Sequence, residues 1–238
     1  MSRSIVAVGP HPDDIELLCM GTLLKLRAEG ARITMITISG AGRGATPDDQ
    51  ISEAELLALR EREARTVADA IGARYECLGA PDNFVQDTPE LRIALARLYQ
   101  AVGADVVLAP APTDYHADHV AASAIAMQAA LMAHGRPVGP EAPLPRAPVV
   151  YHYDTLYGQD FEPGFYIDIS DVIDEKKRLA EMHASQSTFM AATGGRTLSE
   201  MIETLGRFRG GQSMVAYAEA FRISGRHPRV RAWQTFPE

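Results

Sequence analysis

Two short segments of the chain carry the residue types that hold metal ions. The first is His11-Pro12-Asp13-Asp14, which follows an apolar run at residues 5–9. The second is Asp114-Tyr115-His116-Ala117-Asp118-His119, which follows another apolar run at residues 106–109. Catalytic zinc typically takes three nitrogen or oxygen ligands from the protein and leaves one position open. The two segments therefore predict a metal site of the hydrolase type, provided that the fold brings them together.

Three of these side chains form a complete ligand set, namely His11, Asp14 and His119. His116 lies three positions before His119, so at the start of a helix both rings lie on one side. Both can face the metal without both binding it. Asp13 is adjacent to a ligand but free, which makes it the candidate general base for a water at the metal.

Each residue also has a simpler explanation. Asp13 and Asp14 could be acids that stabilise a helix N-terminus, contributing roughly 0.3 to 1 kcal/mol each, and His116 and His119 could be solvated loop residues. Because both explanations must hold at once, the joint occurrence of the two segments favours the metal site. The remaining histidines have no partner segment, and we expect packing or surface positions for His134, His152, His183 and His227.

The elements around these segments alternate between strand and helix patterns. Strand patterns cover residues 4–9, 32–38, 74–78, 105–109 and 148–153, and helix patterns cover residues 14–29, 52–71, from 89 onward, and 120–132. Such alternation predicts an α/β fold with a Rossmann-like, three-layer, doubly wound and mainly parallel sheet. In doubly wound sheets the first and fourth strands are neighbours, and ligands bind at their carboxyl ends. This topology would join the two segments.

Local signals support the helix boundaries. Ser52 and Glu55 form a capping box, Thr88-Pro89 places a hydroxyl before a proline at the first helical position, and Gly30 and Gly72 lie where helices should end.

The connecting loops differ in character. Loops at residues 39–49 and 79–87 should emerge at the carboxyl edge of the sheet, where ligands bind. The segment at residues 135–148 holds five prolines and could be a lid or an oligomer contact.

Length and composition indicate one domain over residues 1–238, because a chain with 46% apolar residues can bury a full core. We expect a Rossmann-like core at about residues 1–155 and a C-terminal extension at about 156–238. The extension should contain a strand at residues 166–170 and helices at residues 176–183 and 199–207.

The net charge of −8 argues against a nucleic-acid partner, which would need a basic surface. Because we find neither a signal segment nor a membrane-spanning apolar stretch, we expect a cytoplasmic protein that acts on a small molecule. Cys19 and Cys77 are expected to be buried free thiols rather than metal ligands. The sequence leaves a homo-oligomer open.

The two segments, together with Glu16 and Gly21-Thr22-Leu23, resemble the PIG-L/LmbE family of zinc-dependent N-deacetylases. The resemblance extends over nearly the whole chain, through Arg60-Glu61-Arg62-Glu63, Ile71-Gly72-Ala73, Leu78-Gly79-Ala80-Pro81-Asp82, Asp168-Ile169-Ser170, Lys176, Ser185-Gln186 and Tyr217-Ala218-Glu219-Ala220-Phe221. It implies a Rossmann-like fold, one zinc held by His11, Asp14 and His119, and Asp13 as the general base.

The resemblance also implies roles for residues outside the ligand set. His116 would stabilise the tetrahedral intermediate as a cation, and Asp118 is the candidate for orienting an imidazole. Arg60 and Asp82 match positions associated with the recognition of substrate hydroxyl groups. Arg60 has an alternative partner in Glu63, which lies three positions later on the same helix.

The implied substrate is a small N-acetylated molecule, above all an N-acetylglucosamine glycoside or conjugate, although a non-sugar N-acyl compound is also open. Relatives often carry Gly-Glu-x-Gly after the second strand, whereas this chain has Gly40-Ala41-Gly42-Arg43-Gly44. Arg43 could bind an anionic aglycone or be a solvated loop residue.

Two other classes of protein use the same residue types. A metal-dependent phosphoesterase would need a second metal and more carboxylates. A non-catalytic sugar-binding protein would leave Asp13 without a function. The metal itself could also be iron, manganese or nickel in place of Zn²⁺.

Overall fold

The computed structural model describes residues 2–46 and 48–225. Its described strands form one seven-stranded sheet in the order β3-β2-β1-β4-β5-β7-β6. The strands are β1 (Ser4–Gly9), β2 (Arg32–Ser39), β3 (Arg74–Ala80), β4 (Val106–Ala109), β5 (Val149–Tyr153), β6 (Phe165–Asp168) and β7 (Ala218–Ile223). Strands β1 to β5 are parallel, and β7 pairs antiparallel with both β5 and β6. The expected α/β fold with a mainly parallel sheet is therefore confirmed.

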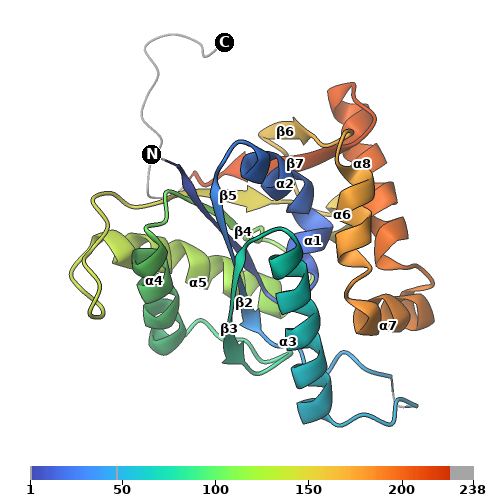
Figure 1. The fold of residues 1–238 in the computed structure, drawn as a ribbon, viewed down its shortest axis with the longest axis horizontal. Helices are drawn as coiled ribbons and strands as arrows, with labels where there is room; N and C mark the ends of the chain where they lie inside the picture. Colours follow the sequence, from blue (N-terminus) through green and yellow to red (C-terminus); the bar gives the residue numbers. More distant parts are fainter. Residues whose placement is uncertain (1, 47, 226–238) are drawn as a thin grey trace.

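Helices cover both faces of the sheet (Figure 1). They are α1 (Asp14–Leu18), α2 (Met20–Ala28), α3 (Glu53–Ala70), α4 (Pro89–Val102), α5 (Ala117–His134), α6 (Ile173–Ala180), α7 (Ala184–Gly194) and α8 (Leu198–Ser213), with a short 3-10 helix, η1 (Leu156–Gly158). Helices α4 and α5 pack on one face, and α1, α2, α3, α6 and α8 pack on the other.

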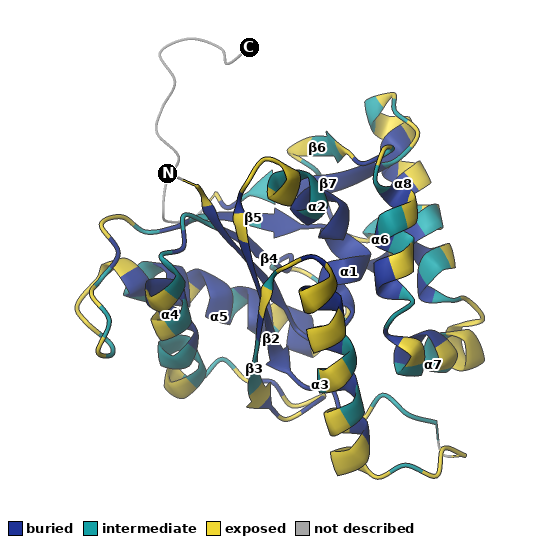
Figure 2. Ribbon diagram, in the orientation of Figure 1, coloured by how far each residue is buried: buried dark blue, intermediate teal, exposed yellow. Residues whose placement is uncertain are grey.

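Strand β1 contributes side chains to both cores because successive residues of a strand point to opposite faces. Val6 and Val8 belong to the core beneath α4 and α5, whereas Ile5 and Ala7 belong to the core beneath the other helices. Figure 2 shows the resulting pattern, with the central strands buried and the outer faces of α3 and α4 exposed. Burial on both faces explains why this strand is apolar throughout.

The local helix signals are confirmed. Ser52 and Glu55 form the capping box at the start of α3, and Thr88 caps α4, which has proline at its first turn. Gly30 and Gly72 follow α2 and α3 with positive φ angles of 86° and 64°, the left-handed conformation that glycine adopts most readily.

The helix expected at residues 14–29 is broken at Cys19, which is buried with φ −145°. A buried carboxylate accounts for the break. Glu219 accepts hydrogen bonds from the backbone N–H groups of Gly21 and Thr22 at 2.8 Å each. These amides in the first turn of α2 have no partner within the helix, and Glu219 supplies one. A side chain at position 21 would approach Ile169 Cγ2 to 2.7 Å, so the junction also requires glycine.

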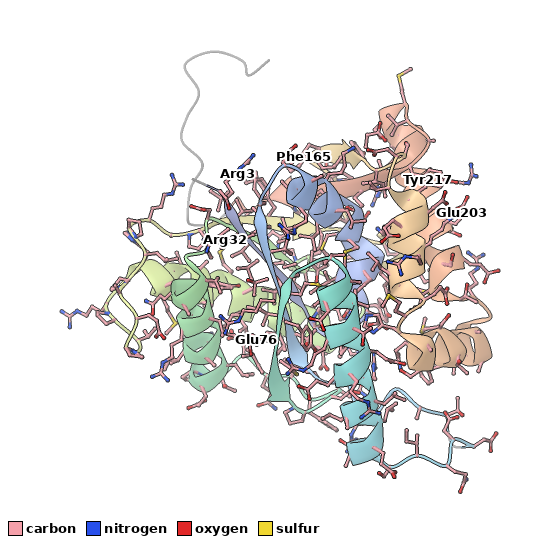
Figure 3. The ribbon with its side chains drawn as sticks, viewed as in Figure 1. Arg3, Arg32, Glu76, Phe165, Glu203 and Tyr217 are labelled. Atoms are coloured by element: carbon pink, nitrogen blue, oxygen red, sulfur yellow. The ribbon has the colours of Figure 1, made fainter. Side chains whose placement is uncertain are left out.

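The C-terminal extension continues the same sheet. Helices α6 and α8 correspond, with shifted bounds, to the helices expected at residues 176–183 and 199–207. Helix α7 and strand β7 were not predicted. Glu203 of α8 accepts hydrogen bonds from Lys177 of α6 and from the Tyr217 hydroxyl. Glu203 and Tyr217 lie side by side in Figure 3, and their contact ties α8 to the start of β7.

The proline-rich segment at residues 135–148 lies at the amino edge of the sheet, because it leads directly into the parallel strand β5. The buried Leu144 anchors it, with its backbone N–H donating to the Ala133 carbonyl. The segment therefore cannot be a lid over the carboxyl edge, and its role as an oligomer contact stays a prediction. Among the described residues, no helix is both long and apolar enough to cross a bilayer.

Candidate metal centre and active site

The topology brings the two polar segments together. Strands β1 and β4 are parallel neighbours, with Ile5 opposite Val106. His11 to Asp14 form the turn from β1 into α1, and His116 is the N-cap of α5, just beyond β4. Both segments therefore leave the sheet at its carboxyl edge, as the sequence predicts for a doubly wound fold.

His11, Asp14 and His119 converge on one point. One ligand atom of each lies within 4.8 Å of the others. Nδ1 of His11 is 3.3 Å from Asp14 Oδ2, and Nε2 of His119 is 3.5 Å from Asp14 Oδ1. Two imidazole nitrogens and one carboxylate form the donor set expected of a catalytic zinc site.

The two imidazoles are each held by a second carboxylate. Nε2 of His11 lies 3.1 Å from Asp118 Oδ2, and Nδ1 of His119 lies 3.1 Å from Asp114 Oδ2. A carboxylate behind a histidine fixes its tautomer and leaves the opposite nitrogen free for a metal. The donor set therefore fits a divalent cation. Asp118 occupies the imidazole-orienting position that the sequence suggests, whereas the matching place of Asp114 was not predicted.

His11, His116 and Asp118 form a second group that could hold a metal ion. In this group Nε2 of His11 contacts Asp118, and Nδ1 of His116 accepts the Asp118 backbone N–H at 3.2 Å. His116 Nδ1 and Asp118 are therefore already engaged, and the group shares His11 with the first one. We infer that the first group is the better metal site and that the two groups cannot be filled independently.

The expected cationic form of His116 does not fit its surroundings. Burial, together with the positive charges of His11 and His119, lowers the pKa of His116. Because its Nδ1 accepts a backbone N–H, the neutral ring carries its proton on Nε2. His116 is therefore arranged as a neutral hydrogen-bond donor.

Asp13 is buried at the start of α1 and has a left-handed backbone with φ 105°. Asp tolerates this conformation better than most residues, and such strained positions concentrate at functional sites. Burial raises the pKa of Asp13 to about 6, although the nearby Arg60 guanidinium opposes the shift. Asp13 thus lines the cavity together with the candidate ligands, and its raised pKa suits a candidate general base.

The candidate ligands His11 and Asp14 have strongly shifted pKa values. Although burial lowers the pKa of His11, its hydrogen bonds to Asp118 and Asp14 raise it to about 10. Burial raises the pKa of Asp14, but the charge of His119 and the hydrogen bond from His11 outweigh it, and the net shift is downward. The buried carboxylates therefore hold positive charge at this point, which favours a bound cation.

Arg60 supports Asp13 and does not pair with Glu63. Its Nη2 is 3.4 Å from Asp13 Oδ2 and donates to the Pro12 carbonyl at 2.6 Å. Glu63 instead accepts the backbone N–H and the hydroxyl of Ser185. The alternative of a helix ion pair is therefore wrong, and Arg60 holds the turn at Pro12 and Asp13 while also lining the cavity.

The other predicted substrate residues come from the loops after β2 and β3. Asp82 Oδ1 is 3.5 Å from His11 Nε2, and Asp82 Oδ2 accepts the Arg43 backbone N–H at 2.8 Å. The Arg43 guanidinium lies 3.3 Å from Glu53 and 5.1 Å from the centre of the Phe84 ring. Its charge is thus shared with an acid, which weakens the case for an anionic aglycone at this corner.

His183 is not a surface residue, because it is fully buried with its Nε2 3.1 Å from Glu16 Oε1. His152 is also buried, and its Nδ1 faces the Pro110 carbonyl at 2.7 Å. His134 is exposed and its Nδ1 lies 2.8 Å from the Leu144 carbonyl, and His227 lies outside the described residues. The sequence had no signal for the Glu16 and His183 pair, because its members are far apart in the chain.

The site residues surround one cavity of about 250 Å³. Its polar lining includes His11, Asp13, Asp14, Arg43, Arg60, Asp82, Asn83, His116, His119 and Gln186. Asn83 and Gln186 were not predicted as site residues by themselves. Gln186 donates to the Gly44 carbonyl at 3.1 Å and so joins α7 to the loop after β2.

Known proteins resemble this chain in sequence and in fold. The chain is 25% identical to diacetylchitobiose deacetylase of Thermococcus kodakarensis, over 93% of this chain and 83% of that protein. It is also 25% identical to 4-oxalmesaconate hydratase of Pseudomonas putida, over 77% of this chain and 74% of that protein. The structure of N,N'-diacetylchitobiose deacetylase from Pyrococcus horikoshii has a similar fold, with a TM-score of 0.82 and 24% identity over 93% of this chain and 84% of that one.

A family model described as GlcNAc-PI de-N-acetylase matches residues 6–130, which is more than half of the chain. The match includes both polar segments and the strands β1 and β4 that position them. Topology, site residues and the family model therefore agree, and the chain belongs to the PIG-L family.

Proposed function

We propose that this chain is a zinc-dependent N-deacetylase that removes an acetyl group from a small substrate containing N-acetylglucosamine. The observation that carries the proposal is the carboxylate of Asp13, which lies outside the ligand group of His11, Asp14 and His119 but lines the same cavity. A base next to a three-ligand site is the arrangement that metal-assisted hydrolysis requires. The deacetylase relative supports the same reaction.

In this mechanism His11, Asp14 and His119 hold the metal, while Asp118 and Asp114 keep the imidazoles in the correct tautomer. A bound zinc supplies Lewis acidity toward the acetyl carbonyl and lowers the pKa of a coordinated water. Asp13 accepts the proton of the attacking water and then donates it to the departing nitrogen. The products are acetate and a free amine.

His116 stabilises the oxyanion that develops on the acetyl carbonyl by donating from Nε2. The carbonyl is expected to lie beside this ring, because His116 lines the cavity next to His119. Removal of one oxyanion donor costs about 100-fold or more in kcat, so His116→Ala should lose that amount while retaining the metal.

We assign Arg43, in the loop after β2, and Asp82, in the loop after β3, to substrate binding. We assign Arg60 both to substrate binding and to the support of Asp13. Because Arg43 is paired with Glu53, a neutral sugar with free hydroxyl groups suits this corner better than an anionic group. Arg43→Ala should therefore change kcat/KM for neutral and anionic aglycones by similar factors. A selective loss for anionic aglycones would instead assign it to anion binding.

Acetate release from a panel of N-acetyl sugars and N-acetyl amino compounds tests the reaction and the substrate class together. We expect turnover of N-acetylglucosamine derivatives by the zinc-loaded protein and almost none by Asp13→Asn, with zinc content unchanged. Asparagine is the suitable replacement because it tolerates the left-handed backbone of position 13, whereas alanine would add strain. Full activity of Asp13→Asn, or of zinc-free protein, would contradict the mechanism.

The competing functions give different results in the same assays. A hydratase like the Pseudomonas putida relative would release no acetate. A phosphoesterase would contain about two metal ions per chain, because such sites generally use a metal pair. A sugar-binding protein would bind N-acetyl sugars without consuming them.

A further inference from the structure

The cavity has a second lining that the deacetylase mechanism does not use. The lining also contains six apolar side chains, here called the apolar wall: Leu17, Leu156, Phe189, Met190, Leu198 and Met201. Acetate has a single methyl group and would contact only a small part of such a surface. Four members of the wall are buried, whereas Phe189 and Met190 are only partly buried, so these two present the most apolar surface to an additional ligand group.

The apolar wall is built mainly by the C-terminal extension. Leu17 follows Asp13 by one helical turn, and its backbone N–H donates to the Asp13 carbonyl at 2.9 Å. Leu198 and Met201 belong to the first turn of α8, which a capping box at Thr197 and Glu200 fixes. Apart from Leu17, every residue of the wall lies beyond the stretch at residues 6–130 that matches the family model.

A buried ion pair holds Leu156 in place. Arg209 Nε donates to Asp154 Oδ2 at 2.6 Å, and Arg209 Nη2 donates to Asp154 Oδ1 at 3.0 Å. Both side chains are almost fully buried. Because Asp154 lies two residues before Leu156, the ion pair fixes the backbone that carries Leu156. The two remaining members, Phe189 and Met190, are only partly buried and face the cavity from α7.

The loop after β3 and the apolar wall are different parts of the cavity lining. Asp82 and Asn83 come from that loop, and Asp82 Oδ1 is 3.5 Å from His11 Nε2. Hydroxyl groups on the amine portion of a substrate would find their partners there. The apolar wall comes from α1, η1, α7 and α8, so it is left to the acyl portion.

We propose that the apolar wall is an acyl-chain subsite and that this enzyme hydrolyses N-acyl amino sugars whose acyl group is longer than acetyl. The inference rests on the proposed amide hydrolysis at the same site. Water adds to the acyl carbon, the carbon–nitrogen bond breaks, and the proton passes through Asp13 to the nitrogen. A carboxylate and a free amine leave, so no other reactant is needed.

A series of N-acyl glucosamines measures the subsite directly. We would compare acetyl, propanoyl, butanoyl and hexanoyl groups on the zinc-loaded wild type. Burial of one methylene corresponds to about fourfold in affinity, so kcat/KM should rise by about that factor for each added methylene until the wall is filled. A parallel series with a constant acetyl group and methyl to hexyl glycosides should stay nearly constant.

Two matched substitutions locate the effect. Met190→Ala removes a partly buried side chain from the wall, whereas Met214→Ala makes the same change at a position that is 96% exposed and outside the cavity. We expect Met190→Ala to reduce the ratio of hexanoyl to acetyl activity at least about threefold. Met214→Ala should match the wild type in both series.

The outcomes separate this inference from the proposed function. If acetyl is hydrolysed but each longer acyl group is slower, the acyl subsite is wrong while the deacetylase stands. If the glycoside series gains activity instead, the wall binds the aglycone and the inference also fails. If no member of either series is hydrolysed, the proposed function fails, and the subsite fails with it. The wild-type series decides these cases even if a variant does not fold.

Discussion

The two nitrogen atoms of His11 have different partners, and this division explains how a buried site can hold a cation. Nδ1 faces Asp14, whereas Nε2 contacts Asp118 and lies near Asp82. In the absence of metal the acids stabilise a protonated ring, which is why the pKa of His11 rises to about 10. A metal at Nδ1 must replace that proton, so metal binding and proton release are coupled.

We therefore predict that zinc affinity increases with pH. His11 is protonated in the metal-free protein below about pH 10, and a metal needs the neutral ring, so each pH unit between 6 and 9 should raise the apparent affinity up to about tenfold. Competition titrations with a chelator of known affinity would measure this slope. Isothermal calorimetry in two buffers of different ionisation enthalpy would count the released protons.

Asp118→Asn is the variant that tests the role of the orienting carboxylate. It should weaken zinc binding by about 10- to 100-fold, the usual effect of removing a carboxylate behind a ligating histidine. It should also flatten the pH dependence, because the hydrogen bond to Asp118 contributes to the raised pKa of His11. An affinity that is independent of pH between 6 and 9 in the wild type would mean that metal binding displaces no proton from His11.

At the scale of elements, patterns within the sequence predict the core well and the extension poorly. Strand β1 and its neighbours are apolar runs between helices, and these were recognised. The first turns of helix α7 contain Ser185, Ser187 and Thr188, and such residues have low helix propensity. Ser185 is held by Glu63 from α3. Strand β7 contains the buried Glu219, whose partners come from α2 and α6. Contacts between distant segments thus determine both elements.

The same limit applies to the candidate site. The spacing of His116 and His119 and the place of Asp13 can be inferred from the sequence because they depend on local structure and topology. The partner of Arg60 is different, since Glu63 was the nearer acid in sequence but Asp13 is the nearer acid in space. The residues of the apolar wall also come from separate elements, and no local pattern links them.

Glu219 offers a test of how the extension is attached to the core. It accepts two amides at the start of α2, and Lys176 of α6 donates to it at 2.5 Å, with both side chains buried. Glu219→Gln would leave the Lys176 charge without a counter-charge, so we expect a loss of about 3 to 5 kcal/mol in the free energy of unfolding. Urea denaturation of the metal-free protein would measure it.

The matched control is an exposed acid of the same type. Glu175 pairs with Arg178 on the surface of α6, where its side chain is 44% exposed. Glu175→Gln should cost less than about 1 kcal/mol, as is usual for exposed ion pairs. Equal effects of the two substitutions would mean that Glu219 does not hold the extension to the core.

At the scale of the whole molecule, the metal site lies where two segments that are far apart in the sequence meet. His11 and Asp14 leave β1 on one side of the topological switch point, and His119 belongs to the first turn of α5 on the other. A metal that binds only this folded arrangement must stabilise the whole domain. The size of that stabilisation depends on the free metal concentration and not on the catalytic residues.

We predict that zinc raises the melting temperature of the wild type by about 5 to 10 °C. Free zinc at about one hundred times its dissociation constant contributes about 2.7 kcal/mol, and each kcal/mol shifts a domain of this size by about 2 to 4 °C. His119→Ala should abolish the shift, whereas Asp13→Asn should retain it because Asp13 is the base and not a ligand. His134→Ala is the control, since His134 contacts the Leu144 carbonyl away from the site. Differential scanning calorimetry with and without chelator would measure the shifts, and a normal zinc shift in His119→Ala would remove His119 from the ligand set.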